Sequence, residues 1–216
     1  MKLVIGNKNY SSWSMRPWIL LKHFEIPFRE IRIPLYEEAS AQQIRAQSPS
    51  GKLPCLIDEE NGWSIWDSLA ICETLAERFP QHQMWPSDPT QRAHARSIAA
   101  EMHAGFGALR NNMSMNLRAS LAGRGRTPEV FADIARIDEI WTDCAARYDG
   151  PFLFGEFGIA DAMFVPVVMR FNIYHVELSA PAAAYATRIN DLASVKQWIA
   201  EAVEETEVIP RFELYP

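Results

Sequence analysis

The sequence predicts an α/β domain followed by an all-helical domain. Three observations carry this prediction: strand-like and helix-like patterns alternate in residues 1–80, residues 80–90 contain three prolines, and no strand-like alternation follows residue 90. The chain has 216 residues, a length that fits one large domain or two small ones. We therefore expect a first domain of residues 1–80, a linker of residues 81–90 and an all-helical domain of residues 91–216.

The first strand and helix follow from the first two dozen residues. Residues 2–6 form a short apolar run, which predicts a buried strand. From Met15 onward the apolar residues have helical spacing. Because proline is tolerated best in the first turn of a helix, Pro17 predicts a helix that starts within two residues of Met15, with Ser14 as its N-cap. Residues 28–33 alternate like a second strand.

The rest of the first domain completes the order β-α-β-α-β-β-α. Residues that favour turns separate the expected helices and strands in this part of the chain. In order, we expect a short polar helix at 37–47, a strand at 54–58, a hairpin turn at Asn61-Gly62, a strand at 63–66 and a helix from Asp67-Ser68 onward.

Beyond the linker, the apolar residues keep helical spacing. Glycine-containing breaks divide this part of the chain. The pattern predicts helices near 90–118, 128–148, 159–171 and 192–204.

Composition excludes several classes of function. The 21 Lys+Arg and 27 Asp+Glu give a net charge of −6, and no long basic stretch predicts binding to nucleic acid. The longest apolar stretch, Ile159 to Met169, is too short to span a bilayer, and the N-terminus lacks the apolar region of a secretory signal. Cys55, Cys72 and Cys144 form no CxxC pair, which fits a reducing, cytoplasmic environment. The five histidines show no metal-ligand spacing, so we expect no metal.

Four local motifs, in this order and spacing, resemble those of the soluble glutathione transferases. Ser11-Ser12-Trp13-Ser14-Met15-Arg16 is similar to the zeta-class pattern S-S-C-S-x-R, with Trp13 in the place of Cys. Ser48-Pro-Ser-Gly-Lys-Leu-Pro54 is similar to N-P-x-x-x-V-P, and Trp66-Asp67-Ser68-Leu-Ala-Ile71 is similar to (E/Q/D)-S-x-A-I. Gly158-Ile-Ala-Asp161 resembles the S/T-x-x-D capping box, with glycine at the cap.

The resemblance covers nearly the whole chain and implies a fold and partners. It implies a thioredoxin-like N-terminal domain, a helical C-terminal domain that forms the electrophile pocket, and a homodimer. It also implies that glutathione and a small electrophile are the substrates. Asp161 would have a structural role, and the three cysteines would be small core residues.

Glutathione is a tripeptide with a central thiol and a carboxylate at each end, and each group has a candidate partner. The resemblance implies a cis Leu53-Pro54 bond, which would leave the Leu53 N–H and C=O free to pair with the cysteinyl residue. Ser68 and the helix N–H groups would hold the γ-glutamyl carboxylate, and Asp67 the α-ammonium group. Lys52 would touch glutathione or be a solvated loop lysine. The alternatives are an ordinary trans proline and plain N-capping by Asp67.

Ser11 occupies the position of the family's catalytic Ser or Cys. Its hydroxyl would donate a hydrogen bond to the thiolate. A free thiol has a pKa of about 8.5, and lowering it by about two units requires roughly 2.7 kcal/mol. One hydrogen bond to a charged acceptor supplies about 1.5–3 kcal/mol, and the helix dipole adds about 0.3–1 kcal/mol. Ser12 and Tyr10 are alternative donors, and capping of the following helix is the alternative role for the serines.

Two further features concern the second substrate. Trp13 fills space near the thiol and argues against maleylacetoacetate isomerase activity. In the first helix beyond the linker, Phe106 and Arg110 either line the electrophile pocket or serve core packing, and Arg110 would bind an acidic group.

Together these features predict a cytoplasmic glutathione transferase, with a role in detoxification, that uses serine-type thiol activation. A zeta-like isomerase or peroxidase is one alternative. A disulfide-exchange enzyme is another, although it needs a protein thiolate and residues 11–14 contain no cysteine. A non-enzymatic module that binds glutathione or other ligands is a third.

Overall fold

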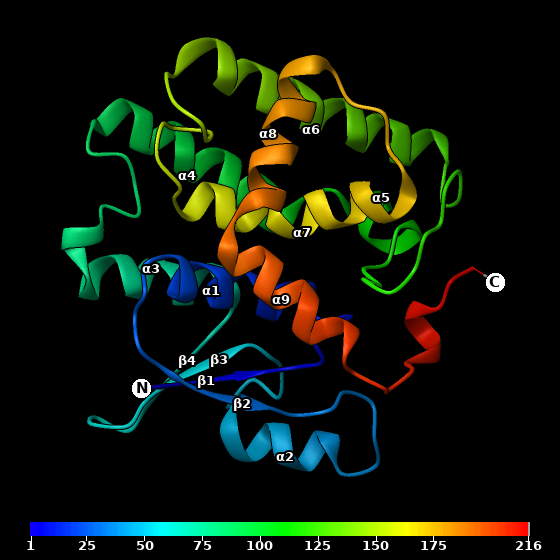
Figure 1. Ribbon diagram of the computed structural model, residues 1–216. Coiled ribbons are helices and arrows are strands. Elements are labelled where there is room, and N and C mark those ends of the chain that lie inside the picture. Colours follow the sequence, from blue (N-terminus) through cyan, green and yellow to red (C-terminus); the bar gives the residue numbers. More distant parts are fainter. Residues whose placement is uncertain (216) are drawn as a thin grey trace.

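The computed structural model describes residues 1–215, which form a four-stranded sheet with helices on both faces, next to a layer of helices (Figure 1). The order of elements confirms the predicted α/β part followed by a helical part. The elements are β1 (Lys2–Ile5), α1 (Ser12–His23), β2 (Arg29–Arg32), α2 (Ser40–Gln47), β3 (Cys55–Asp58), β4 (Trp63–Trp66), α3 (Ser68–Arg78), η1 (Pro80–His82), α4 (Pro89–Ala104), α5 (Gly107–Asn112), α6 (Pro128–Arg147), α7 (Ile159–Tyr174), α8 (Ala180–Asp191), α9 (Ala193–Val203) and η2 (Pro210–Phe212).

The sheet has the strand order β2-β1-β3-β4. β1 pairs in parallel with β2 and antiparallel with β3, and β3 forms the predicted hairpin with β4. The inner strand β1 is apolar after Lys2 because both faces of the sheet are covered there. This mixed sheet, with its helices, has the expected thioredoxin-like architecture.

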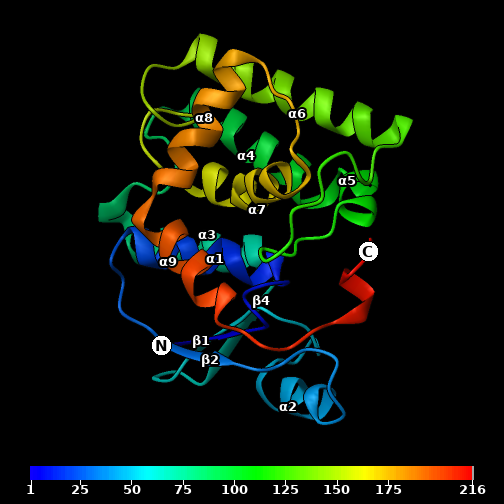
Figure 2. The same ribbon diagram turned by 45° about the vertical axis from the view of Figure 1, so that its right-hand side comes forward.

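The two parts of the chain share a continuous hydrophobic core. α1 and α3 lie between the sheet and the helical layer, whereas α2 covers the opposite face (Figures 1 and 2). α1 packs against both α7 and α9. Nearly every residue of α7 is buried, as its apolar sequence predicts for a central helix. A smaller cluster of Val4, Ile33, Ile44 and Cys55 includes side chains from β1, α2 and β3.

The start of α1 differs from the sequence prediction. The helix begins at Ser12, so its N-cap residue is Ser11 rather than Ser14. Pro17 therefore lies inside the helix, where it removes one backbone hydrogen bond. Burial of the helix face from Met15 to Leu21 compensates for this loss, because tertiary packing outweighs local propensity. Ser14 is fully buried in the first turn, and its Oγ accepts a hydrogen bond from the Gly6 N–H at 3.2 Å.

The predicted helix at 90–118 is two helices, α4 and α5. The break falls at Gly105-Phe106, where Phe106 has a left-handed backbone with φ of 56°. A Cβ atom on Gly105 would lie 2.7 Å from the Glu101 carbonyl oxygen, so only glycine fits this tight exit. α8 was not predicted, although its buried residues Ala182, Tyr185, Ala186 and Ile189 have helical spacing; half of this face is alanine, a weaker apolar signal than larger side chains.

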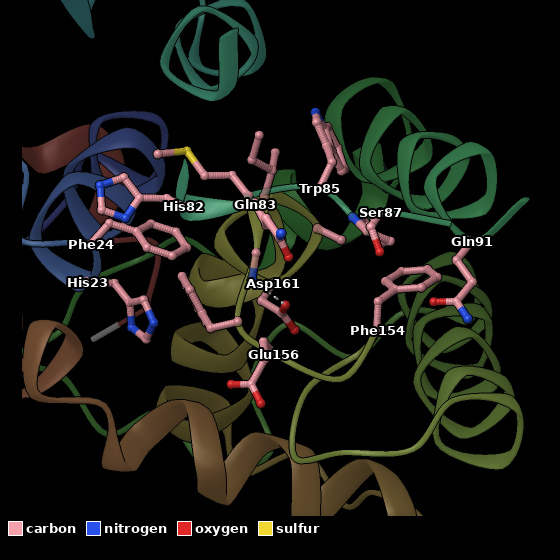
Figure 3. Close-up of a pocket in the computed structure, with 16 residues that line it drawn as sticks. His23, Phe24, His82, Gln83, Trp85, Ser87, Gln91, Phe154, Glu156 and Asp161 are labelled. Carbon is pink, nitrogen blue, oxygen red and sulfur yellow. Dashed lines mark hydrogen bonds between the residues drawn. The ribbon is translucent and has the colours of Figure 1, made fainter. Parts of the chain in front are cut away.

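The predicted cap of α7 is confirmed. Asp161 accepts hydrogen bonds from the Gly158 N–H at 2.9 Å and the Leu153 N–H at 3.1 Å. The structure also explains why glycine replaces Ser or Thr at the cap: a Cβ on Gly158 would lie 2.7 Å from the Met84 carbonyl oxygen. Figure 3 shows Asp161 at the base of a cavity of ≈ 350 Å³, to which the end of α1, the η1 segment and the start of α7 contribute.

The described residues contain neither a membrane-spanning helix nor a cluster of metal-ligating side chains. None of their helices is long and apolar enough to cross a membrane. Residues 1–215 also contain no group of three or more His, Cys, Asp or Glu side chains arranged to hold a metal ion.

Candidate functional site

Two adjoining cavities lie where the N-terminal ends of α1 and α3 face the helical part of the chain. They share Trp13, Lys52 and Leu53 in their walls. The smaller cavity has a volume of ≈ 520 Å³ and the larger one ≈ 700 Å³. The smaller cavity is lined by Trp13, Ser50, Lys52, Leu53, Pro54, Trp66, Asp67 and Ser68. The larger cavity is lined by residues that include three with hydroxyl groups and three arginines: Tyr10, Ser11, Ser12, Arg110, Arg170 and Arg211.

The smaller cavity contains the expected backbone partner for an extended peptide. The Leu53–Pro54 bond is cis, as the resemblance implied. Within residues 1–215, neither the N–H nor the C=O of Leu53 makes a hydrogen bond outside the regular elements. Both groups are therefore available to a bound peptide.

The N-terminus of α3 lies at one end of the smaller cavity and offers hydrogen-bond donors to it. Asp67 is its N-cap, and one carboxylate oxygen accepts from the Leu69 N–H at 2.9 Å and the Ala70 N–H at 3.3 Å. This cap leaves the Ser68 N–H as a free donor of the first turn. The Ser68 Oγ accepts from the Arg16 guanidinium at 3.3 Å, so its own proton is free to be donated. The capping role and the binding role of this helix end are thus compatible.

Arg16 places a buried positive charge behind Ser68. The side chain is only 2% exposed, and within the described chain its Nε has no hydrogen-bond partner. Its guanidinium stacks on the ring of Trp13 at 4.2 Å. Burial, together with the charges of Arg170 and Arg110, lowers the pKa of Arg16 to about 9. At neutral pH Arg16 is still a cation, and it favours a carboxylate at the end of α3.

His103 connects the helical part of the chain to the cap of α3. Its Nε2 lies 3.0 Å from the second Asp67 carboxylate oxygen, and its ring meets Trp13 edge to face. Burial lowers the pKa of His103, an effect that the Asp67 charge opposes and those of Arg16 and Arg110 reinforce. A neutral His103 donates to Asp67 and leaves the full negative charge of this carboxylate for a cationic ligand group.

This geometry predicts how glutathione affinity depends on pH. If Asp67 holds the α-ammonium group of glutathione, as the resemblance implies, His103 becomes a competing cation below its lowered pKa. As the pH falls below this pKa, glutathione should therefore bind about two- to fivefold more weakly, the value of an exposed ion pair. Calorimetry at pH 7 and at a series of lower pH values measures the effect. His103→Gln should abolish the pH dependence and His94→Gln, on the same helix, should preserve it; equal dependence in all three proteins would contradict the assignment.

Tyr10, Ser11 and Ser12 all line the larger cavity, but their hydroxyl groups have different partners. The Ser11 Oγ and the Ser14 Oγ form a hydrogen bond of 2.7 Å. The Ser12 Oγ accepts from the Arg170 guanidinium at 3.3 Å, which leaves the Ser12 proton free. Tyr10 donates to Glu213 at 2.6 Å, and burial raises its pKa. Ser11 and Ser12 lie at the start of α1, where unpaired backbone N–H groups and the helix dipole favour a negative charge.

The larger cavity is rich in positive charge. Arg110 and Arg170 come from the helical part, Lys52 from the loop before β3 and Arg211 from the C-terminal segment, whereas Glu37 is the acidic residue in its lining. Arg170 is buried, and its other nitrogens are held by the backbone carbonyls of Met113 and Pro166. Such a cavity favours an anionic ligand.

Phe106 does not line either of these two cavities. It is buried in the core at the break between α4 and α5. Of the two roles considered for Phe106, the structure places it in the core, whereas Arg110 does line the larger cavity.

Sequence reasoning missed several residues of this site. Arg170 had a signal: apart from Asp161 it is the only charged residue of α7, and a charge in an apolar helix needs a specific partner. His103, Tyr36 and Phe212 had no comparable signal. They reach the cavities only through the packing of distant segments.

The fold and cleft define a class of two-domain proteins, in which a thioredoxin-like domain offers a peptide site and a helical domain closes a second cavity over it. Comparison with known protein families places the chain in such a class. The family description "Glutathione S-transferase, N-terminal domain" matches residues 10–78, and "Glutathione S-transferase, C-terminal domain" matches residues 92–201. The chain belongs to the glutathione S-transferase family, a family of glutathione-dependent enzymes.

Individual relatives support the zeta-like resemblance. The chain is 28% identical over 197 residues to a probable maleylacetoacetate isomerase of Caenorhabditis elegans, covering 88% of this chain and 86% of the relative. Its fold matches a bacterial zeta-class maleyl pyruvate isomerase with a TM-score of 0.72 at 20% identity, over 96% of this chain and 100% of the other. A Burkholderia glutathione transferase homologue with bound glutathione matches with a TM-score of 0.68 at 20% identity, over 94% and 98%.

Proposed function

We propose that this protein is a glutathione S-transferase that activates the glutathione thiol through a serine hydroxyl, for attack on a small electrophile. The observation that carries the proposal is the cleft itself. One wall offers a free backbone at Leu53, a free Ser68 N–H and hydroxyl, and the Asp67 carboxylate. The next wall offers two serine hydroxyls at the start of a helix.

Each group of glutathione has a partner in this cleft. The Leu53 backbone pairs with the cysteinyl residue in the manner of an added strand. Ser68, backed by the buried Arg16 cation, holds the γ-glutamyl carboxylate, and Asp67 holds the α-ammonium group. Lys52 lines both cavities and contributes positive charge beside the peptide. Trp13 separates the peptide from the larger cavity.

Ser11 is the proposed thiolate donor. On ligand binding its proton turns from Ser14 toward the sulfur, and the Ser14 hydroxyl donates to Ser11 in its place. Because the Gly6 N–H donates to Ser14, the three groups form a chain in which each bond strengthens the next. Ser12 is the alternative donor, favoured by the hydrogen bond from Arg170 to its oxygen. Tyr10 is the least suitable of the three because its proton is committed to Glu213.

The electrophile is proposed to be a small molecule with an acidic group. Arg110, Arg170 and Arg211 support this choice. A glutathione-dependent isomerase is the second candidate, supported by the names of the isomerase relatives. In that reaction the thiolate adds to an activated cis double bond, the new single bond rotates, and expulsion of the thiolate gives the trans isomer and regenerates glutathione. Peroxide reduction is a third possible activity of the same thiolate.

An activity panel with and without glutathione separates these candidates. It comprises an aryl halide, a hydroperoxide, a mixed disulfide and a cis-dienoic acid. Glutathione-dependent turnover of the aryl halide or the dienoic acid is expected. Turnover of the mixed disulfide alone would contradict the proposal, and so would the absence of any turnover, which would favour a binding module.

We further propose a homodimer, a cytoplasmic location and a role in detoxification. The dimer is supported by Trp63 and Trp66 on the edge strand β4, which are 70% and 45% exposed. The location is supported by three buried free cysteines. The role in detoxification follows from the proposed conjugation.

Sedimentation of the protein should show twice the chain mass of 24.6 kDa, and a monomer at micromolar concentration would contradict the dimer.

A further inference from the structure

The C-terminal tail, residues 204–215, crosses from the helical part of the chain back to the loop that carries the serines. Figure 2 shows this segment, in red, leaving α9 and ending near the loop that follows α5. Its short η2 helix lies at the larger cavity, where Arg211 and Phe212 are part of the wall. The ring of Phe212 stacks on that of Tyr10 with centroids 5.6 Å apart.

Glu213 is bonded to two buried groups at this crossing. Its carboxylate accepts from the Tyr10 hydroxyl at 2.6 Å, and from the Asn116 amide at 3.0 and 2.9 Å. Tyr10 and Asn116 are 3% and 4% exposed, whereas Glu213 itself is exposed. The carboxylate thus closes a buried polar network from outside without being part of the core.

The same network fixes the loop before α1. The Asn9 amide donates to Asn116 at 2.8 Å, and the backbone N–H of Asn9 donates to Glu205 at 3.1 Å. The Arg118 guanidinium donates to the Tyr10 hydroxyl at 3.0 Å. Tyr10, the residue directly before Ser11, is therefore held mainly by groups from the tail and from the loop after α5.

We propose that Glu213 is a positioning residue for thiol activation. Through Tyr10 it holds the loop so that Ser11 and Ser12 face the bound thiol. This inference rests on the proposed function, because it concerns the same thiolate. It adds that the C-terminal tail takes part in thiol activation, although Glu213 lies outside the glutathione cleft.

The test is the pKa of the thiol of bound glutathione, measured by ultraviolet thiolate absorbance in the full-length protein. Glu213→Ala should raise this pKa by roughly 0.5–1 unit while the glutathione Kd changes less than about twofold. Glu213→Gln keeps a carbonyl acceptor for Tyr10 and should restore most of the wild-type pKa. Tyr10→Phe should raise the pKa at least as much, because it also removes the bond from Arg118, and the double variant should shift the pKa by less than the sum of the two, because both changes remove the Tyr10–Glu213 hydrogen bond.

The control is Glu204→Ala, an exposed carboxylate at the start of the same tail. It should titrate as wild type does. Glu213→Ala removes an acceptor of two buried donors, so its melting temperature should fall by a few degrees, and the thiol pKa is compared at a temperature where both proteins are fully folded. A wild-type thiol pKa in Glu213→Ala, or an equal shift in Glu204→Ala, would overturn the proposal. A wild-type protein that leaves the thiol pKa unshifted would instead refute the proposed function, and this inference with it.

Discussion

At pH 7, Ser11→Ala is expected to lower the rate of glutathione-dependent turnover about 10–100-fold. In the proposed mechanism this hydroxyl donates a hydrogen bond to the thiolate, worth about 1.5–3 kcal/mol in the barrier. Its loss raises the thiol pKa, so less thiolate is present at neutral pH. The deficit should shrink as pH rises, because hydroxide then deprotonates the thiol. Glutathione affinity should change little, since the proposed anchors of the peptide are Leu53, Asp67 and Ser68.

The neighbouring serines decide whether this effect belongs to Ser11. Ser14→Ala should give a smaller deficit of the same kind, because Ser14 supports Ser11 rather than capping the helix. Ser97→Ala, an exposed serine on α4, should be neutral. If Ser12→Ala has the large effect and Ser11→Ala has none, the donor is the hydroxyl held by Arg170. If neither has an effect, the helix end alone stabilises the thiolate.

Asp161→Ala is expected to cause the largest loss of stability. It removes the acceptor of two backbone N–H groups, those of Leu153 and Gly158, at the buried start of α7. Leaving a buried donor unpaired costs about 1–3 kcal/mol, and the partly buried Gly158 N–H should cost about 1 kcal/mol, so the free energy of unfolding should fall by about 2–4 kcal/mol. At about 2–4 °C per kcal/mol for a chain of this size, the melting temperature should fall by roughly 5–15 °C.

The matched control is Asp191→Ala at the end of α8, whose carboxylate is 69% exposed and pairs with Lys196. It should change the free energy of unfolding by less than about 0.5 kcal/mol. Thermal or urea unfolding of both variants measures the difference. Equal stability of the two variants would show that the cap of α7 contributes little.

Much of the fold could be predicted because local rules decide it. The hairpin at Asn61-Gly62 and the start of α3 follow from turn and cap residues that act within a few positions. The start of α1 could not, because burial of its apolar face outweighs the cost of Pro17 inside the helix. The break at Gly105-Phe106 was missed because apolar spacing continues through it.

The residues of the candidate site likewise fall into those that the sequence predicts and those that it does not. Leu53-Pro54, Asp67-Ser68 and Ser11 lie at ends of strands and helices that topology brings to one edge of the sheet. His103 and Glu213 reach this edge from segments far away in the sequence. The positions of these two side chains depend on how the helical part and the C-terminal tail pack against the sheet. No local sequence pattern encodes this packing.

Above all, we propose that the cleft beside Leu53 and Ser68 binds glutathione. Isothermal titration calorimetry of wild-type protein at pH 7 tests it most directly. We expect one glutathione per chain, and at least about fourfold weaker binding by Ser68→Ala, equivalent to roughly 1 kcal/mol. The absence of any heat from wild-type protein at millimolar glutathione would contradict the account.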